Sequence, residues 1–72
     1  MIYDYSKLKG KIREVCSTQE VFAKSLDRTD TAINNKLNNK SYFTQSEISK
    51  AVEVLDIKQE EIYEYFFKEK VE

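Results

Sequence analysis

The 72-residue sequence has no histidine, no proline and no tryptophan, and it contains a single cysteine and a single glycine. The missing histidine excludes zinc sites built from cysteine and histidine, and it excludes catalysis that relies on an imidazole. The lone thiol, Cys16, cannot form a disulfide within the chain. Tight turns between strands need residues with positive φ, which this sequence barely supplies. We therefore expect an all-α fold.

Long hydrophobic runs are missing as well. The apolar runs are far shorter than the roughly 18 residues that cross a bilayer, and residues 1–15 lack the apolar region of a signal peptide. No nucleophile–base pair, glycine-rich phosphate loop or cluster of metal ligands is apparent either. We therefore expect a reduced, cytoplasmic environment, no membrane segment, no metal or cofactor, and no enzymatic activity.

Charged residues make up 35% of the chain and hydrophobic ones 40%, a composition typical of one small globular domain. The net charge of −1 hides an uneven distribution. Residues 7–40 carry eight basic and four acidic side chains, whereas residues 41–72 carry four basic and eight acidic ones. This asymmetry fits a protein with one half that faces a polyanion, although charges that only solvate helix surfaces produce the same pattern.

The spacing of apolar residues predicts five helices. Side chains able to cap a helix precede four of them, at Asp4 or Ser6, at Thr18, at Thr29, and at Thr44 or Ser46. The expected core stripes are Leu8, Ile12 and Val15; Phe22, Ala23 and Leu26; Ile33 and Leu37; Ile48, Ala51, Val52 and Leu55; and Ile62, Tyr63, Tyr65, Phe66 and Phe67. Cys16 is expected to be a small apolar residue of the core or its boundary.

Residues 27–29 form a short connector between the second and third predicted helices, and the third is unusually polar. Asparagine is a poor helix former, so the four asparagines at 34, 35, 38 and 39 need an explanation as caps, turns or contact residues. A helix-turn-helix has this layout: two short helices are joined by a tight turn, and the second helix is polar on its outer face.

Three stretches carry a family resemblance. Residues 18–26 (TQEVFAKSL) resemble the opening "TQ-x-x-Leu-Ala-x-x-Leu" of phage repressor and Cro-type regulators, and residues 31–40 resemble their recognition helix. Residues 48–57 are similar to their fourth helix, and both ends look like those of short phage and prophage regulators of Gram-positive bacteria. The chain departs from the pattern at Asp27 and Asn39, where glycine is usual, and at Arg28, where a small apolar residue is usual and a core contact is expected to weaken.

The resemblance implies a compact five-helix, lambda-repressor-like DNA-binding domain over residues 1–72, with a helix-turn-helix at about 18–39. It implies a sequence-specific regulator of transcription that represses by occupying an operator in double-stranded DNA, at the nucleoid of a bacterial host. The base-reading positions would be Asp30, Thr31, Asn34, Asn35 and Asn38, and the phosphate-binding positions Gln19, Thr29 and Lys40. Asparagine suits this task because its amide pairs with adenine, and threonine contacts either base type.

The C-terminal aromatic residues exceed what a last helix needs to cover so small a core. We expect part of this set, Tyr63, Phe66 and Phe67, to form the two-fold interface of a homodimer, which would bind a palindromic operator. All of them could instead lie inside the monomer.

A second function is compatible with the same sequence. A protein-interaction module, such as an antirepressor or co-regulator, could use the same helical fold without reading bases. The carboxylate of Asp30, which phosphates would repel, and the pI of about 5.5 favour this alternative.

Overall fold

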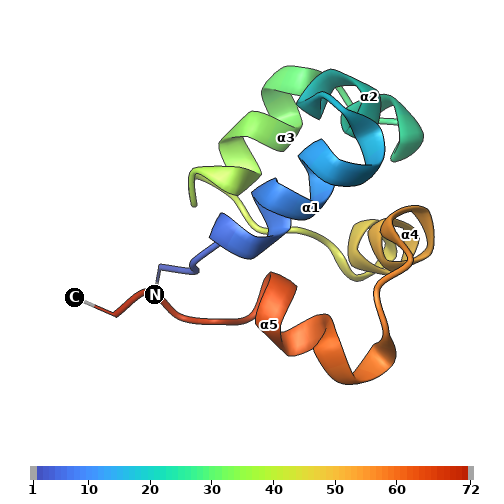
Figure 1. The fold of residues 1–72 in the computed structure, drawn as a ribbon. Helices are drawn as coiled ribbons and strands as arrows, with labels where there is room; N and C mark the ends of the chain where they lie inside the picture. Colours follow the sequence, from blue (N-terminus) through green and yellow to red (C-terminus); the bar gives the residue numbers. More distant parts are fainter. Residues whose placement is uncertain (1, 72) are drawn as a thin grey trace.

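A computed structural model describes residues 2–71 of the chain. Its elements are α1 (Ser6–Cys16), α2 (Gln19–Ser25), α3 (Asp30–Leu37), α4 (Gln45–Leu55), a single 3₁₀ turn η1 (Gln59–Glu61) and α5 (Ile62–Phe66). The predicted all-α fold with five helices is confirmed. Helix α1 is central, because it contacts α2, α4 and α5, and α3 packs on α2 (Figure 1). The Cα radius of gyration is 11.1 Å.

Most of the expected apolar stripes form one core. Leu8, Phe22, Ile33 and Leu55 are the largest fully buried side chains. The expectation for Val15 is wrong: its side chain is 45% exposed, and Cys16 takes the core position instead. The reason is that α1 buries residues 8, 12 and 16, each four apart, which keeps them on one face of the helix.

Three helices begin at a threonine whose hydroxyl accepts a hydrogen bond from the third residue of the helix. The acceptor is Thr18 for α2, Thr29 for α3 and Thr44 for α4, with N···O distances of 3.2, 3.1 and 3.1 Å. These caps confirm the predicted helix starts. The first helix lacks such a cap, because the carboxylate of Asp4 instead accepts from the backbone N–H and the hydroxyl of Ser6.

The turns are made without glycine. Across residues 2–71, four other residues have positive φ: Ser17 (71°), Asp27 (58°), Asn39 (63°) and Asp56 (53°). Asparagine and aspartate tolerate this conformation better than most side chains. Asp27 and Asn39 therefore close the turns on either side of α3 where the sequence has no glycine to offer.

A buried carboxylate ties the connector between α2 and α3 to the rest of the fold. Glu47, on α4, is 3% exposed and accepts hydrogen bonds from Arg28 Nε (2.7 Å), from Lys36 Nζ and from the backbone N–H of Thr44 (2.8 Å). Arg28, expected only to weaken a core contact, instead pairs with Glu47. This ionic cluster fixes the connector and α3 relative to α4.

The two ends of the chain lie side by side (Figure 1). Tyr3 and Glu69 form an antiparallel bridge, Asp4 N–H donates to the Lys68 carbonyl (2.7 Å), and Lys70 N–H donates to the Ile2 carbonyl (2.8 Å). The longest helices between residues 2 and 71 have 11 residues, and none could cross a membrane.

Candidate functional site

The outer face of α3 carries most of the polar side chains that the sequence singles out. Asp30, Thr31, Asn34 and Asn38 are exposed, and Asn35 is half-buried. The face is presented to solvent because Ile33 and Leu37, on the opposite side of the helix, are buried in the core. The helix therefore offers hydroxyl, amide and carboxylate groups to any partner that approaches it.

Gln19, at the start of α2, links the two helices at this face. Its Nε2 donates to Asp30 Oδ1 at 3.0 Å and lies 3.4 Å from Asn34 Oδ1. Gln19 thus donates to two other side chains that were predicted to contact DNA. The amide hydrogens of Gln19 are engaged within the protein, and the carboxylate of Asp30 stays at the surface.

Two other predicted site residues have local structural roles. Thr29 caps α3, and Asn38 Nδ2 donates to the Asn34 carbonyl at 2.9 Å, which satisfies the last turn of the helix. Lys40 is exposed just beyond α3. Asn39, which was not among the predicted site residues, bonds Tyr3 in both directions: its Oδ1 accepts from the Tyr3 N–H (2.8 Å) and its Nδ2 donates to the Tyr3 carbonyl (3.0 Å).

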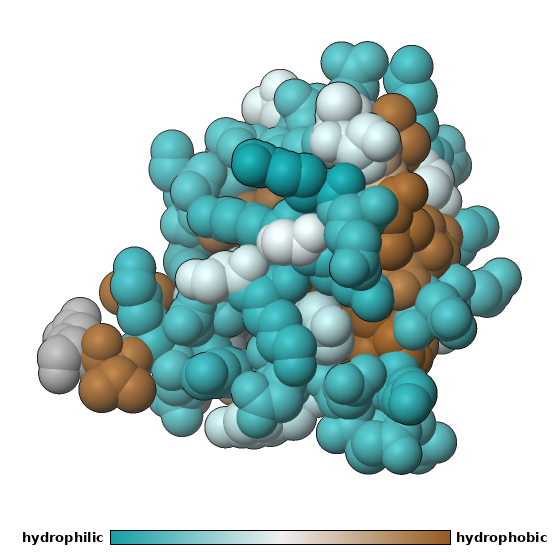
Figure 2. Space-filling view, viewed as in Figure 1, coloured by the Kyte–Doolittle hydropathy of each residue, from teal (hydrophilic) through white to brown (hydrophobic). Residues whose placement is uncertain are grey.

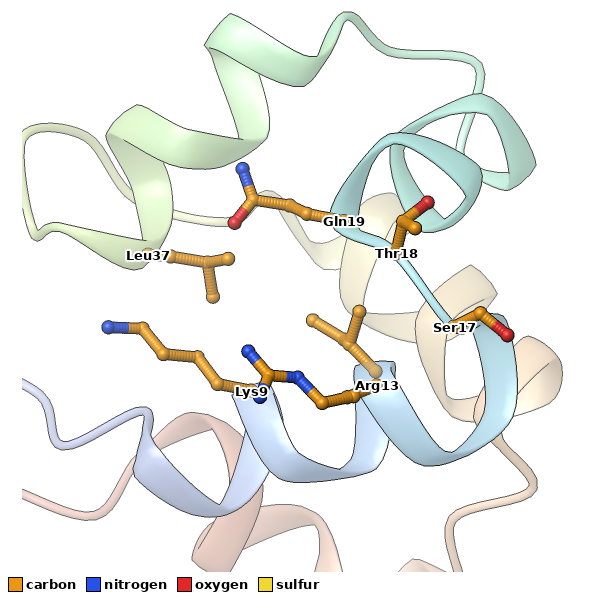
Figure 3. Close-up of a pocket in the computed structure, with 7 residues that line it drawn as sticks. Lys9, Arg13, Ser17, Thr18, Gln19 and Leu37 are labelled. Carbon is orange, nitrogen blue, oxygen red and sulfur yellow. The ribbon is translucent and has the colours of Figure 1, made fainter.

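A groove that sequence reasoning did not identify runs between α1 and α3. Its main cavity has a volume of about 450 Å³ and is lined by Lys9, Ile12, Arg13, Ser17, Thr18, Gln19 and Leu37. Figure 3 shows Lys9 and Arg13 side by side on α1, with Leu37 and Gln19 across the cavity from them. The i, i+4 spacing of Lys9 and Arg13 was the available signal, because it places both on one side of a helix.

The C-terminal aromatic residues divide into two groups. Phe66 is only 2% exposed and belongs to the core, so it is not available to a second chain, and its expected place in a dimer interface is wrong. Tyr63 and Phe67 are 58% and 41% exposed. Phe67 borders a shallow apolar cavity of about 300 Å³ together with Ile48, Val52 and Ile62. In Figure 2, apolar surface gathers toward α4, whereas the face over α1 and α3 is mostly hydrophilic.

The fold is similar over its whole length to a solved phage protein. The solution structure of the modulator of repression (MOR) of the temperate bacteriophage TP901-1 from Lactococcus lactis matches with a TM-score of 0.80 and 44% sequence identity. The match covers 100% of this chain and 97% of the phage protein. A search of the curated proteins finds no match. The similar protein is a modulator of repression and not a repressor, so the prediction that this chain is a Cro- or repressor-like DNA-binding protein is wrong.

The family assignment made from the sequence is wrong as well. The matching family model is not one of the repressor or Cro families; it is described as "Protein of unknown function (DUF739)" and matches residues 1–69. The likeness over residues 18–57 reflects the way the helices begin and pack, which a repressor and a modulator can share. On this match, and on the identity to the phage modulator, the chain belongs to the DUF739 family.

Proposed function

We propose that this protein modulates phage repression by binding a repressor protein, and that it does so without reading DNA bases. The observation that carries the proposal is the 44% identity, over the full length of the chain, to a modulator of repression. The alternative function that the sequence allowed, an antirepressor or co-regulator with the same helical fold, is the one this similarity supports. Such a role belongs in the cytoplasm of a bacterial host.

The chemistry of the α3 face agrees with a protein partner. Asp30 is exposed at the start of α3, where a DNA-reading helix would come close to phosphates, and a carboxylate there is repelled by them. The exposed hydrogen bonds from Gln19 to Asp30 and Asn34 engage an amide group that could otherwise have donated to a phosphate. Exposed amide, hydroxyl and carboxylate groups on a rigid helix suit the polar contacts of a protein interface.

We assign the partner contacts to Asp30, Thr31, Asn34 and Asn35 on α3. Their side chains are exposed or half-buried, and the ionic cluster at Glu47 holds the helix that carries them. Self-association through Tyr63 and Phe67, which are both exposed, is a separate part of the proposal.

Isothermal titration calorimetry of the purified chain with the repressor of the same phage or prophage tests the proposal. We expect saturable binding, and we expect the double variant Asp30→Ala, Asn34→Ala to weaken it at least tenfold. Glu53→Ala, an exposed acidic position on α4, is the matched control and should bind as the unchanged protein does.

In parallel, a random pool of duplex DNA is selected with the chain alone at about 0.15 M salt, the physiological ionic strength. No sequence should be enriched. Enrichment of a specific site that is lost in the same double variant, with no binding to the repressor, would overturn the proposed function.

A further inference from the structure

We propose that the groove between α1 and α3 is the docking site for an acidic, amphipathic segment of the protein partner, and that Lys9 and Arg13 bind its carboxylates. This docking site depends on the proposed function for the identity of the partner. It adds a second contact surface beside the α3 face and states the chemistry that the surface accepts.

The two cations in the groove are free to bind an anion. Several other basic side chains have an acidic neighbour: Lys11 Nζ lies 3.1 Å from Glu14, Lys24 Nζ lies 3.8 Å from Glu20, and Lys36 pairs with Glu47. Within residues 2–71, no acidic side chain lies within ion-pair distance of Lys9 or Arg13. Both face the same cavity from successive turns of α1 (Figure 3). They therefore place two positive charges side by side with no partner inside the protein.

The floor of the cavity is apolar. Ile12 and Leu37 line it and are 3% and 4% exposed, so little of either side chain remains to be covered. The aliphatic stems of Lys9 and Arg13 border this floor, and the apolar side chains of an amphipathic segment can pack on them while its carboxylates meet the two charges. A phosphate group offers no apolar surface. The cavity thus favours a carboxylate on a peptide over the backbone of a nucleic acid.

The amide of Gln19 supports the same choice. Because Nε2 is directed to Asp30 and Asn34, the carbonyl oxygen points toward Leu37 and the cavity (Figure 3). A carbonyl oxygen can only accept a hydrogen bond. A peptide has N–H groups to donate to it, whereas the phosphodiesters of DNA have acceptors only.

The groove is long enough for a segment rather than a single ion. A second cavity of about 320 Å³ shares Lys9 and Leu37 with the first and continues to Asn38, Asn39 and Lys70. Asp4 is the acidic residue at this end, and its carboxylate is already hydrogen-bonded to Ser6. The combined groove therefore holds three cations and one anion, which gives it a positive net charge.

The test compares two variants that remove the same amount of charge. Lys9→Gln with Arg13→Gln removes both positive charges of the main cavity and keeps part of each aliphatic stem. Lys50→Gln with Lys58→Gln removes two exposed cations elsewhere. We expect the dissociation constant for the repressor to rise about tenfold in the groove variant and less than about twofold in the control, because opposite charges across an interface attract. Circular dichroism melts should show that both variants stay folded.

A second measurement uses a defined probe. A synthetic amphipathic helical peptide with glutamates four residues apart and leucines between them is titrated into the chain, and the methyl signals of Ile12 and Leu37 are followed by NMR. We expect these signals to shift with this peptide and to stay in place with the matched glutamine peptide.

The outcomes separate the two proposals. If the groove variant binds the repressor as tightly as the control does, the docking site is wrong and the proposed function stands. If the unchanged protein does not bind the repressor, the proposed function fails, and the peptide titration alone decides the groove: shifts specific to the glutamate peptide support it, and their absence overturns it. Equal methyl shifts with a 12-base-pair duplex or with inorganic phosphate would overturn the preference for a carboxylate.

Discussion

Arg28 Nε and Glu47 Oε2 are 2.7 Å apart, so a residue in the connector before α3 is bonded directly to the first turn of α4. Lys36, from α3 itself, binds the other carboxylate oxygen. The side chain of Glu47 is 2% exposed, that of Lys36 is 13% exposed and that of Arg28 is 42% exposed. The ion pair with Lys36 is therefore shielded from solvent, and the pair with Arg28 is open to it on one side.

Replacement of Glu47 by alanine should unfold the protein at room temperature. Removal of one partner of a buried ion pair costs about 3–5 kcal/mol, because it leaves Lys36 desolvated without a partner. A domain this small has only about 3–5 kcal/mol of net stability. Far-UV circular dichroism of the variant without denaturant shows whether the helices are lost, and urea denaturation measures the stability of the unchanged protein and of the control. The control Glu53→Ala, exposed on the same helix, should change the free energy of unfolding by less than about 0.5 kcal/mol.

The stability of the fold should fall in acid because of the same residue. Burial disfavours the charged form of Glu47, but the hydrogen bonds from Lys36, the Thr44 backbone and Arg28 outweigh burial and lower its pKa from 4.5 to about 2. With the folded pKa below the unfolded one, the unfolded state takes up the proton first. The contribution of Glu47 is present above pH 4.5 and is lost progressively as the pH falls to about 2.

The measurement is the midpoint of urea unfolding between pH 6 and pH 2, for the unchanged protein and for Glu47→Gln. The glutamine variant should be less stable at pH 6, and its stability should vary less with pH in the acid range. Equal slopes for the two proteins would show that other carboxylates control the acid transition.

Asn39 should have two separable roles. Its φ of 63° favours glycine, and its side chain holds Tyr3 through two hydrogen bonds. Asn39→Gly should lose both hydrogen bonds to Tyr3 with a small change in the free energy of unfolding. Asn39→Ala should be less stable than the glycine variant by about 1–2 kcal/mol, because a Cβ is strained in the left-handed region. Hydrogen exchange of the Tyr3 amide reports the first role, and urea unfolding of the two variants reports the second.

The aromatic residues of α5 and its C-terminal end should respond differently to substitution. Phe66→Ala should destabilise the fold by about 3–5 kcal/mol, the usual cost of truncating a buried phenylalanine. Tyr63→Ala should leave the fold intact and reduce any self-association, since Tyr63 is 58% exposed. Sedimentation velocity over a range of protein concentrations measures the association. A monomer at every concentration before the substitution would contradict the proposed dimer.

The arrangement of the helices was predictable from the sequence because its signals are local. The threonines at 18, 29 and 44 mark helix starts, and apolar spacing marks the buried faces. Even Glu47 carried a readable signal, since Thr44 and Glu47 have the spacing of a capping box, which the structure contains. The ion pairs of Glu47 with Arg28 and Lys36 were not predictable, because they join segments that only the tertiary fold brings together.

The function was harder to read than the fold. The exposed asparagines of α3 suit adenine and suit a protein surface equally, so their chemistry does not discriminate between the two. The groove at Lys9 and Arg13 exists only because Leu37 and Gln19 lie opposite them, and neither the spacing on α1 nor the polar residues of α3 implies that juxtaposition. Among the predicted site residues, Asp30 was the one whose chemistry argued against DNA binding.

The pairing of the two chain ends has a kinetic consequence. Most contacts in this fold join residues close in sequence, which favours rapid folding. The bridge between Tyr3 and Glu69 is different, because nearly the entire chain must close as a loop before it forms. We infer that this bridge forms last during folding. It should also open first in the native state, so the amides of Asp4 and Lys70 should exchange with solvent before those of α1.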